Sequence, residues 1–261
     1  NDENGIWSIT GLAVDADNNR LWVSSAATPL FAAYTVADEG HGALFELNLK
    51  TLEVLGRYNV PADGLKHEPG ALVVTEDNHV YLIDRAIPIV YQKAPGSDRL
   101  EAFFANPELL GLTDIAITPD NSRIFISDVA KGLMVIDPIA GQAAMLSGPE
   151  TLNLGGVGSV DYNEGQLFII QGGFEPQRVI RLTLDDTGGA VKTVGPMATA
   201  LSEFNHPALG TIWGESLFYI ANTGADESSG AIVMSARLDA AYEVKPPTIE
   251  ELQKVLQKKT P

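Results

Sequence analysis

Four polar side chains that could bind a metal or transfer a proton stand at the starts of apolar segments. His67 and Glu68 precede the segment 70–74, His206 precedes 209–213, and Asp114 opens 114–117. Imidazole nitrogens suit zinc and carboxylate oxygens suit calcium, and the same groups serve as general acids and bases. If these segments converge, the four residues form a candidate divalent-cation site, with His67 and His206 as candidate catalytic residues. The alternative is that they only bond to water and exposed backbone.

The segments that would position these side chains are copies of one sequence unit. An apolar segment, a polar turn and a second segment rich in aromatic and β-branched residues recur at 11–24, 70–83, 114–127, 158–170 and 209–220. This pattern predicts a β-hairpin. A further alternating pair of segments follows most copies, as at 43–60, 133–146 and 179–194. Two hairpins per repeat make a four-stranded antiparallel meander, which is the blade of a β-propeller.

The repeat predicts an all-β fold, with a β-propeller over residues 1–247. Equivalent positions are separated by 59, 44, 43 and 50 residues, at Leu21, Val80, Ile124, Leu167 and Leu217. Blades of about 40 to 50 residues are typical, so the first interval contains an insertion. Five repeats are recognisable. We therefore consider a six-bladed ring with one blade missing or degenerate, and a five-bladed ring.

Residues 248–261 form a second unit, a C-terminal amphipathic helix and tail. Thr248 and Glu251 have the spacing of a capping box. Helical periodicity places one apolar face on Ile249, Leu252, Val255 and Leu256. We expect this helix to pack on the flank of the propeller; the alternative is a helix that binds a partner.

Loop lengths distinguish the two faces of the predicted propeller. The turns within the hairpins of the five repeats are short, whereas the links between hairpins and between repeats include all the long segments. These are 26–42, 62–69, 106–113, 148–157, 171–177, 198–207 and 222–230. In a meander these links lie on one face, around the mouth of the central channel. Loops on a rigid scaffold commonly carry function, so we expect a small molecule or a protein to bind there.

Composition limits the partners. Acidic residues outnumber basic ones by 34 to 17, giving a formal net charge of −17, and cysteine is absent. This charge disfavours nucleic acid and anionic membrane surfaces, and no apolar run approaches the length of a membrane span. Disulfides and thiolate chemistry are excluded. The start at Asn1 without a methionine and the acidic composition lead us to expect a periplasmic or secreted location.

The units GLAVD…DNNRLWVSS and DIAITPDNSRIFISD resemble the NHL-repeat and SMP-30/gluconolactonase-like propellers, which are usually six-bladed. The resemblance implies a divalent cation held by a Glu, an Asn and an Asp at inner-strand starts. Glu68 and Asp114 carry over as oxygen ligands. Thr113 or Asp114 stands at the family's Asn, and Gly156 or Val157 at its Asp, so the triad is incomplete.

Three functions follow from these observations. The first is a non-catalytic propeller that binds a small ligand or a protein partner through its long-loop channel face. The alternative is a divalent-metal-dependent hydrolase of the SMP-30/lactonase type that uses calcium or zinc. A second alternative is a structural subunit whose ring is completed by another chain.

Overall fold

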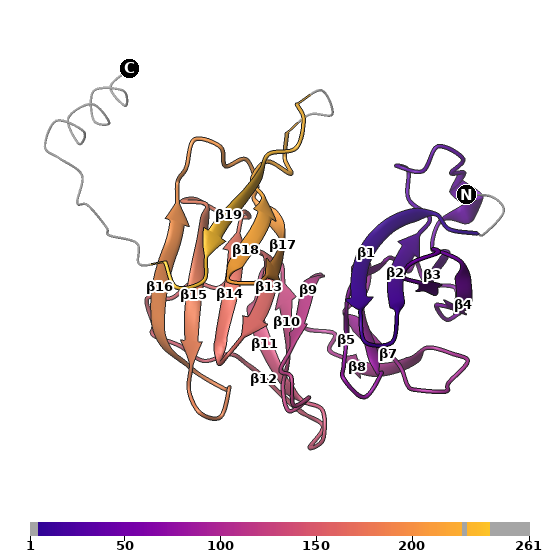
Figure 1. Cartoon of the computed structure of the whole chain (residues 1–261), viewed down its shortest axis with the longest axis horizontal. Coiled ribbons are helices and arrows are strands. Elements are labelled where there is room, and N and C mark those ends of the chain that lie inside the picture. The colour runs from indigo at the N-terminus through magenta and orange to yellow at the C-terminus, as the bar shows by residue number, and fades with distance from the viewer. Residues whose placement is uncertain (1–4, 226–228, 241–261) are drawn as a thin grey trace, which may run out of the picture.

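The computed structural model describes residues 5–225 and 229–240, which form five antiparallel β-sheets (Figure 1). The sequence prediction of an all-β propeller with antiparallel blades is therefore confirmed. Four sheets have four strands and the fifth has three among the described residues. In this part of the chain the one helical turn is the 3₁₀ helix η1 (Val36–Asp38). The predicted C-terminal helix over 248–259 lies outside the described residues.

In each blade the strands lie side by side in the order of the sequence, and the first strand is the innermost. The first blade comprises β1 (Ser8–Asp15), β2 (Arg20–Ala26), β3 (Gly42–Asn48) and β4 (Val54–Asn59). The second comprises β5 (Pro69–Val74), β6 (Val80–Asp84), β7 (Ile89–Lys93) and β8 (Glu101–Ala105). The third comprises β9 (Leu112–Ile117), β10 (Ile124–Asp128), β11 (Gly132–Asp137) and β12 (Gln142–Met145). The fourth comprises β13 (Val157–Asn163), β14 (Gln166–Gln171), β15 (Arg178–Leu184) and β16 (Val191–Thr199). The fifth contains β17 (Ala208–Trp213), β18 (Ser216–Ile220) and β19 (Val233–Arg237).

The hydrophobic core lies mainly between consecutive blades. The second strands β6 and β10 are buried along their whole length, because their side chains contact a neighbouring blade on each side. One apolar cluster joins each successive pair of blades. Between the third and fourth blades, Phe125 stacks on Tyr162 with ring centroids 6.0 Å apart. The repeated apolar positions therefore hold one blade against the next.

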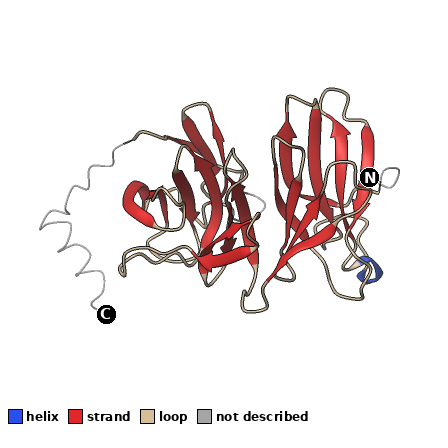
Figure 2. Cartoon of the chain, turned by 90° about the horizontal axis from the view of Figure 1, so that it is seen from below, coloured by secondary structure: helices blue, strands red, loops and turns tan. Residues whose placement is uncertain are grey.

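The described blades form an open ring. The inner strands pack in the order β1, β5, β9, β13 and β17, but β17 and β1 do not pack on each other in the same way. Figure 1 shows β1–β8 on one side and β9–β19 on the other, and Figure 2 shows the same division from below. A sixth sheet is not present among residues 5–225 and 229–240. The six-bladed ring considered above is therefore not supported.

No helix within the described residues is long and apolar enough to cross a membrane.

Candidate functional site

The loops that link hairpins and blades all emerge at one end of the sheets, which we call the long-loop face. It comprises residues 27–41, 60–68, 85–88, 106–111, 129–131, 146–156, 172–177, 200–207, 221–225 and 229–232. The opposite end carries short turns, such as the one between Asp15 and Arg20. The structure thus places the long segments on one face, as their lengths predict.

Two buried aspartates, Asp84 and Asp128, accept hydrogen bonds from the backbone of loops at the second and third blades. Asp128 ends β10, and its Oδ2 accepts hydrogen bonds from the backbone N–H groups of Leu110 and Gly111 at 2.7 and 2.9 Å. Its Oδ1 accepts from Ala130 and Lys131 at 3.0 and 2.8 Å. Burial raises the pKa of this carboxyl, but the four backbone donors outweigh it and hold the pKa below its usual value. The loops 106–111 and 129–131 are therefore tied to one anion.

Asp84 has the equivalent position at the end of β6. Its Oδ1 accepts backbone hydrogen bonds from Glu68 and Ala86, both at 3.0 Å, and from Ile87 at 3.3 Å. Its Oδ2 lies 2.7 Å from Nδ1 of His67. One buried carboxylate therefore joins the loop 60–68 to the loop 85–88.

His67 is enclosed rather than open to a ligand. Its side chain is 1% exposed, and its Nε2 lies 3.0 Å from Oδ1 of Asp63. Burial lowers the pKa of the imidazole, but the hydrogen bonds to Asp63 and Asp84 outweigh it and raise the pKa. Both ring nitrogens are thus engaged by carboxylates, and the Tyr91 hydroxyl lies 3.2 Å from Nδ1.

The other residues of the candidate cation site have different surroundings. The Glu68 carboxylate lies 3.3 Å from a guanidinium nitrogen of Arg85. His206 is exposed and has a positive φ of 56°, and its carbonyl accepts a hydrogen bond from Thr223. Within the residues that the structure describes, no three His, Asp or Glu side chains are grouped so that they could hold a metal ion. The four candidates are therefore not brought together as one ligand set.

Asp114 lies between inner strands rather than at the channel mouth. Its Oδ2 accepts hydrogen bonds from Ser159 Oγ and from the backbone N–H of Val160, both at 2.8 Å. Ile115 N–H donates to Oδ1 at 2.9 Å. Burial raises the pKa of Asp114 to about 6, although these donors lower it in part. The carboxyl therefore links β9 of the third blade to β13 of the fourth.

Asp161 is a second buried carboxyl beside Asp114. Burial and the charge of Asp114 raise the pKa of Asp161 to about 7, while a backbone hydrogen bond from Ile212 opposes the shift. Its Oδ2 is buried and lacks a hydrogen-bond partner. Asp114 and Asp161 thus place two carboxyls with raised pKa values in the wall formed by β9, β13 and β17. The sequence analysis did not single out Asp161.

Large apolar side chains project from the long-loop face. Five are half exposed or more: Leu30 at 86%, Val36 at 80%, Leu110 at 70%, Leu65 at 55% and Val129 at 50%. Their loops touch, because Gly40 lies against the backbone of 65–67 and Gly111 lies against Val129 and Arg85. Exposed apolar residues gathered on one face indicate an interaction surface.

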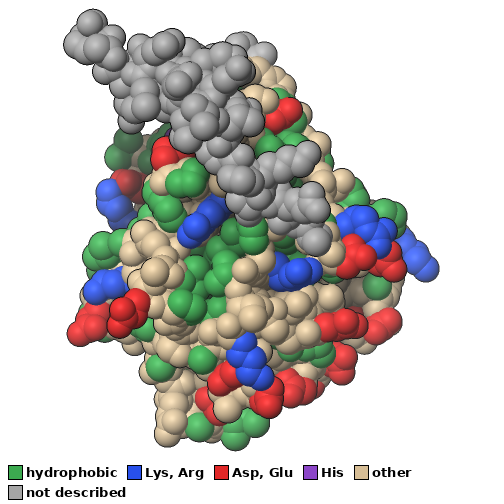
Figure 3. All heavy atoms as spheres, turned by 90° about the vertical axis from the view of Figure 1, so that its left-hand side faces the viewer, with side chains coloured by type: hydrophobic (Ala, Val, Ile, Leu, Met, Phe, Trp, Pro, Cys, Tyr) green, Lys and Arg blue, Asp and Glu red, His purple; other side chains and the backbone are tan. Residues whose placement is uncertain are grey.

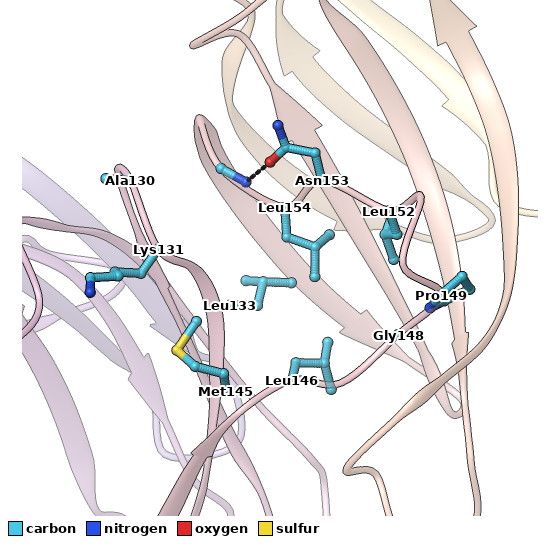
Figure 4. Close-up of a pocket in the computed structure, with 11 residues that line it drawn as sticks. Ala130, Lys131, Leu133, Met145, Leu146, Gly148, Pro149, Leu152, Asn153 and Leu154 are labelled. Carbon is cyan, nitrogen blue, oxygen red and sulfur yellow. Dashed lines mark hydrogen bonds between the residues drawn. The ribbon is translucent and has the colours of Figure 1, made fainter.

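A small cavity adjoins this surface, between the third blade and the loop 146–156 that leads to the fourth blade (Figure 4). Its volume is about 290 Å³, near the lower end for small-ligand pockets of about 300 to 1,000 Å³. Figure 4 shows Leu133, Leu146, Leu152 and Leu154 gathered around it. Asn153 Oδ1 is engaged by the backbone N–H of Gly155 at 2.8 Å. The cavity fits one apolar side chain or a small apolar group.

A larger cavity, of about 580 Å³, lies on the opposite face among the short turns. Its lining includes Arg123 and Lys192, which pair with Asp137 and Asp186 at 2.9 and 2.7 Å. The two basic side chains of this second cavity thus already have partners. The long-loop face combines exposed apolar side chains with fastened loops and is the better candidate for binding.

Charge on the long-loop face follows the acidic character of the whole chain. Its exposed acidic residues are Glu39, Asp63, Glu108, Glu150, Glu175 and Glu203, against exposed Lys66, Arg85 and Lys131. Lys66 pairs with Glu39 at 2.7 Å. On the side of the molecule that Figure 3 shows, basic side chains lie apart from one another. A partner with basic groups around an apolar centre would suit the long-loop face.

Comparison with known proteins gives the class of fold. The chain matches no protein-family profile, and no curated protein matches it in sequence. Its structure is similar to the nidogen–laminin complex structure, with 13% identity and a TM-score of 0.60, covering 82% of this chain and 72% of that chain. The alignment with an inactive virginiamycin B lyase from Staphylococcus aureus, solved with quinupristin, has 13% identity and a TM-score of 0.60. It covers 91% of this chain and 72% of the lyase.

A third similar structure is hydrazine synthase from Kuenenia stuttgartiensis, with 14% identity and a TM-score of 0.58. That alignment covers 83% of this chain and 56% of the synthase chain. At these identities the similarities show the β-propeller fold alone. The resemblance to the NHL and SMP-30/gluconolactonase-like group stays a prediction.

Proposed function

We propose that this propeller is a binding protein that holds a protein partner through its long-loop face. The observation that carries the proposal is the set of exposed apolar side chains on this face, at Leu30, Val36, Leu65, Leu110 and Val129. Exposed apolar side chains with polar residues around them mark protein-interaction sites. The exposed residues of the long-loop face are of these two kinds.

The loops that present these side chains are held before any partner arrives. Asp128 fixes both loops that carry Leu110 and Val129 through four backbone hydrogen bonds. His67 lies between Asp63 and Asp84, which fixes the loop that carries Leu65. A surface with ordered loops loses less conformational entropy on binding. This organisation supports recognition without a large rearrangement.

The partner should carry an apolar centre with lysine or arginine around it. Acidic residues predominate among the exposed charges of the face, and complementary charge increases association rates and selectivity. The cavity beside Leu152 and Leu154 would accept one apolar side chain of the partner. The hydrolase alternative, with its calcium or zinc ion, stays a prediction. Two of its four residues are already engaged: His67 contacts two carboxylates, and Glu68 contacts Arg85.

Peptide binding with matched variants tests this proposal. A set of 16-residue peptides, graded in Leu and Lys content, is measured by fluorescence anisotropy against the wild type and a Leu65→Asp/Leu110→Asp variant. The control is Leu52→Asp/Ile139→Asp, which adds the same charge at exposed leucine and isoleucine positions in turns of the opposite face.

We expect the peptides rich in both Leu and Lys to bind the wild type and the control equally. The long-loop variant should bind them at least about tenfold more weakly, which corresponds to about 1.4 kcal/mol. Equal weakening in both variants, or no dependence on peptide leucine content, would contradict the proposal.

A further inference from the structure

Arg178 is a partly buried arginine at the edge of the long-loop face. It is the first residue of β15 and pairs across the sheet with Gln171, the last residue of β14. Burial lowers the pKa of its guanidinium, and no neighbouring charge opposes the shift. Within residues 5–225 and 229–240, no ion pair joins Arg178 to an Asp or Glu, whereas five other arginines form such pairs: Arg20, Arg85, Arg99, Arg123 and Arg237.

Neutral groups hold one edge of the Arg178 guanidinium. Its Nε donates a hydrogen bond to Oε1 of Gln171 at 2.7 Å, and its Nη2 donates to the backbone carbonyl of Asn153 at 3.1 Å. The guanidinium carbon lies over the Phe174 ring, 5.4 Å from its centroid. These contacts fix the orientation of the guanidinium, and because none of the three groups is charged, they leave its positive charge in place.

Gln171 determines how the arginine is held. Its side chain is fully buried, and its Nε2 donates to the backbone carbonyls of Asn153 and Gly155 at 3.0 and 2.8 Å. Because two carbonyl groups engage the amide nitrogen, the amide oxygen must face Nε of Arg178. Asn153 Oδ1 in turn accepts a hydrogen bond from Gly155, which orders the same loop (Figure 4). The guanidinium is therefore positioned before any ligand arrives.

The other edge of the guanidinium is open. An arginine has five N–H donors, and the described part of the chain provides hydrogen-bond acceptors at Nε and at one Nη2 donor only. The hydrogen bond at Nη2 is exposed, so solvent reaches this end of the side chain. Two parallel N–H groups, one on Nη1 and one on Nη2, match the two oxygens of a carboxylate.

The surrounding charges favour a ligand group with a single negative charge. Glu150 and Glu175 are exposed on the two loops beside Arg178, and the whole chain has a formal net charge of −17. Glu175 is turned toward its own loop, where its Oε2 accepts a hydrogen bond from the backbone N–H of Gln177 at 3.2 Å. A dianion such as phosphate would be repelled more strongly than a carboxylate. The open edge of Arg178 therefore suits a planar monoanion.

We propose that Arg178 is a binding site for one carboxylate, which it holds end-on through Nη1 and Nη2. Gln171 and Asn153 act as positioning residues for the guanidinium. The carboxylate comes from a free organic acid or from the C-terminus of a peptide chain, since both present the same planar group. The site goes beyond the proposed protein-binding role and does not depend on it, because a small carboxylate is sufficient to test it.

Side-chain NMR of the wild type tests the site without any substitution. The Nε–H signal of Arg178 is followed during titration with sodium acetate, with acetamide as the neutral control and sodium chloride at equal ionic strength. Arg57 is the internal reference, because it also donates to a neutral acceptor, Asn59, and lies over an aromatic ring, Phe45. We expect acetate alone to shift the Arg178 signal to saturation, with the Arg57 signal unchanged. An equal response of both arginines, or an equal response to chloride, would contradict the site.

N-acetyl-leucine and N-acetyl-leucinamide distinguish the two sources of the carboxylate. They share one apolar side chain, but only the first ends in a carboxylate, as a peptide chain does. Binding of N-acetyl-leucine at least about tenfold tighter than acetate would assign the site to chain ends, and equal affinity would assign it to free acids. Either result supports the proposal. Equal binding of N-acetyl-leucine and its amide would overturn it, since the carboxylate would then contribute nothing.

Two substitutions at Arg178 separate its charge from its planar shape. Arg178→Gln removes the charge, Arg178→Lys keeps the charge without the fork of N–H groups, and Arg57→Gln is the matched control. We expect Arg178→Gln to weaken acetate binding at least about tenfold, Arg178→Lys to weaken it less, and the control to bind as the wild type does. The Tm of each variant shows separately whether the fold is kept. Wild-type affinity for acetate in a folded Arg178→Gln variant would overturn the proposal.

Discussion

The Nδ1 atom of His67 lies 2.7 Å from Oδ2 of Asp84, and both side chains are almost completely buried. The second oxygen of Asp84 accepts three backbone hydrogen bonds from the loops on either side. The contact therefore connects an imidazole at the end of one loop to the backbone of the next. This makes His67 part of the support of the long-loop face.

His67→Gln should lower the free energy of unfolding by about 2 to 4 kcal/mol, because Asp84 would keep a buried charge without its cationic partner. Urea denaturation at pH 6 measures this loss. His79→Gln is the control, since His79 pairs with Asp77 at the partly exposed turn between β5 and β6. The control should change stability by less than about 0.5 kcal/mol. A similar small loss in both variants would show that His67 contributes no more than a surface histidine.

The same histidine gives a pH dependence of known sign. Its pKa is raised in the folded state, so its contribution is fully present below the ordinary pKa of about 6.5. The contribution is lost as the pH rises through the folded-state pKa. Denaturation of the wild type between pH 6 and pH 9 should show falling stability, and His67→Gln should flatten this part of the curve. An unchanged slope in the variant would contradict the assignment.

Asp161→Asn should stabilise the protein at pH 8. The pKa of Asp161 is raised to about 7 and that of Asp114 to about 6, so the folded state binds more protons than the unfolded state above pH 4. Stability therefore falls as the pH rises from about 4 to 7. The amide keeps an acceptor for Ile212 and removes the buried charge, so the variant should have a higher Tm at pH 8 and a flatter pH profile.

Asp120→Asn is the control for that experiment. Asp120 is exposed, and hydrogen bonds from the Thr118 and Ser122 side chains lower its pKa to about 2. Its contribution is present above the ordinary pKa and is lost as the pH falls, the opposite sign to Asp161. This variant should not gain stability at pH 8. A gain as large as that of Asp161→Asn would show that the effect is one of net charge.

Asp128→Asn should weaken both stability and peptide binding at the long-loop face. The amide offers one acceptor oxygen in place of two, so some of the N–H groups of 110–111 and 130–131 lose their partner. We expect a loss of about 1 to 3 kcal/mol in unfolding free energy and faster hydrogen exchange in both loops. The exposed Asp98 supplies the control, Asp98→Asn. An unchanged rate of amide hydrogen exchange at residues 110–111 would contradict the role of Asp128 in holding these loops.

Lys93→Met should be tolerated better than Lys93→Ala. The ammonium lies 4.8 Å from the Tyr58 ring centroid and 5.6 Å from that of Trp22, and the residue is 6% exposed. Methionine preserves most of the buried volume, whereas alanine leaves a cavity that costs about 2 to 4 kcal/mol. Thermal denaturation of the two variants compares these costs. Equal losses would show that the cation, rather than the packing of the side chain, provides the stabilisation.

The sequence predicts the blades well because each repeat carries its own alternation and turn residues. It also predicts the face with the long loops, since the order of strands in a meander decides where each link lies. The ends of β6 and β10 read VYLID and IFISD. The shared terminal Asp was an available signal for the role of Asp84 and Asp128 in fastening the loops.

The contacts of individual side chains could not be predicted in the same way. His67 and His206 both precede inner strands, yet one is buried between two carboxylates and the other is exposed. The Oδ2 atom of Asp161 is buried because β9 and β17 flank its strand, and the segment GSVDYN contains no local sign of this. The place of a residue in the sequence repeat predicts its approximate position in the blade. Its burial and its hydrogen bonds depend on how neighbouring blades pack, which the repeat does not show.

An arc of blades also has a consequence for cooperativity. Each of the three central blades shares an apolar cluster with a neighbour on both sides, whereas the first and last share such a cluster on one side only. Stacked repeats of this kind behave as a linear array whose stability depends on nearest-neighbour interfaces. Amide protons of β1 and β17 should then exchange through partial openings that leave β9 protected. Unfolding would begin at the two ends and advance toward the third blade, rather than occur as one event.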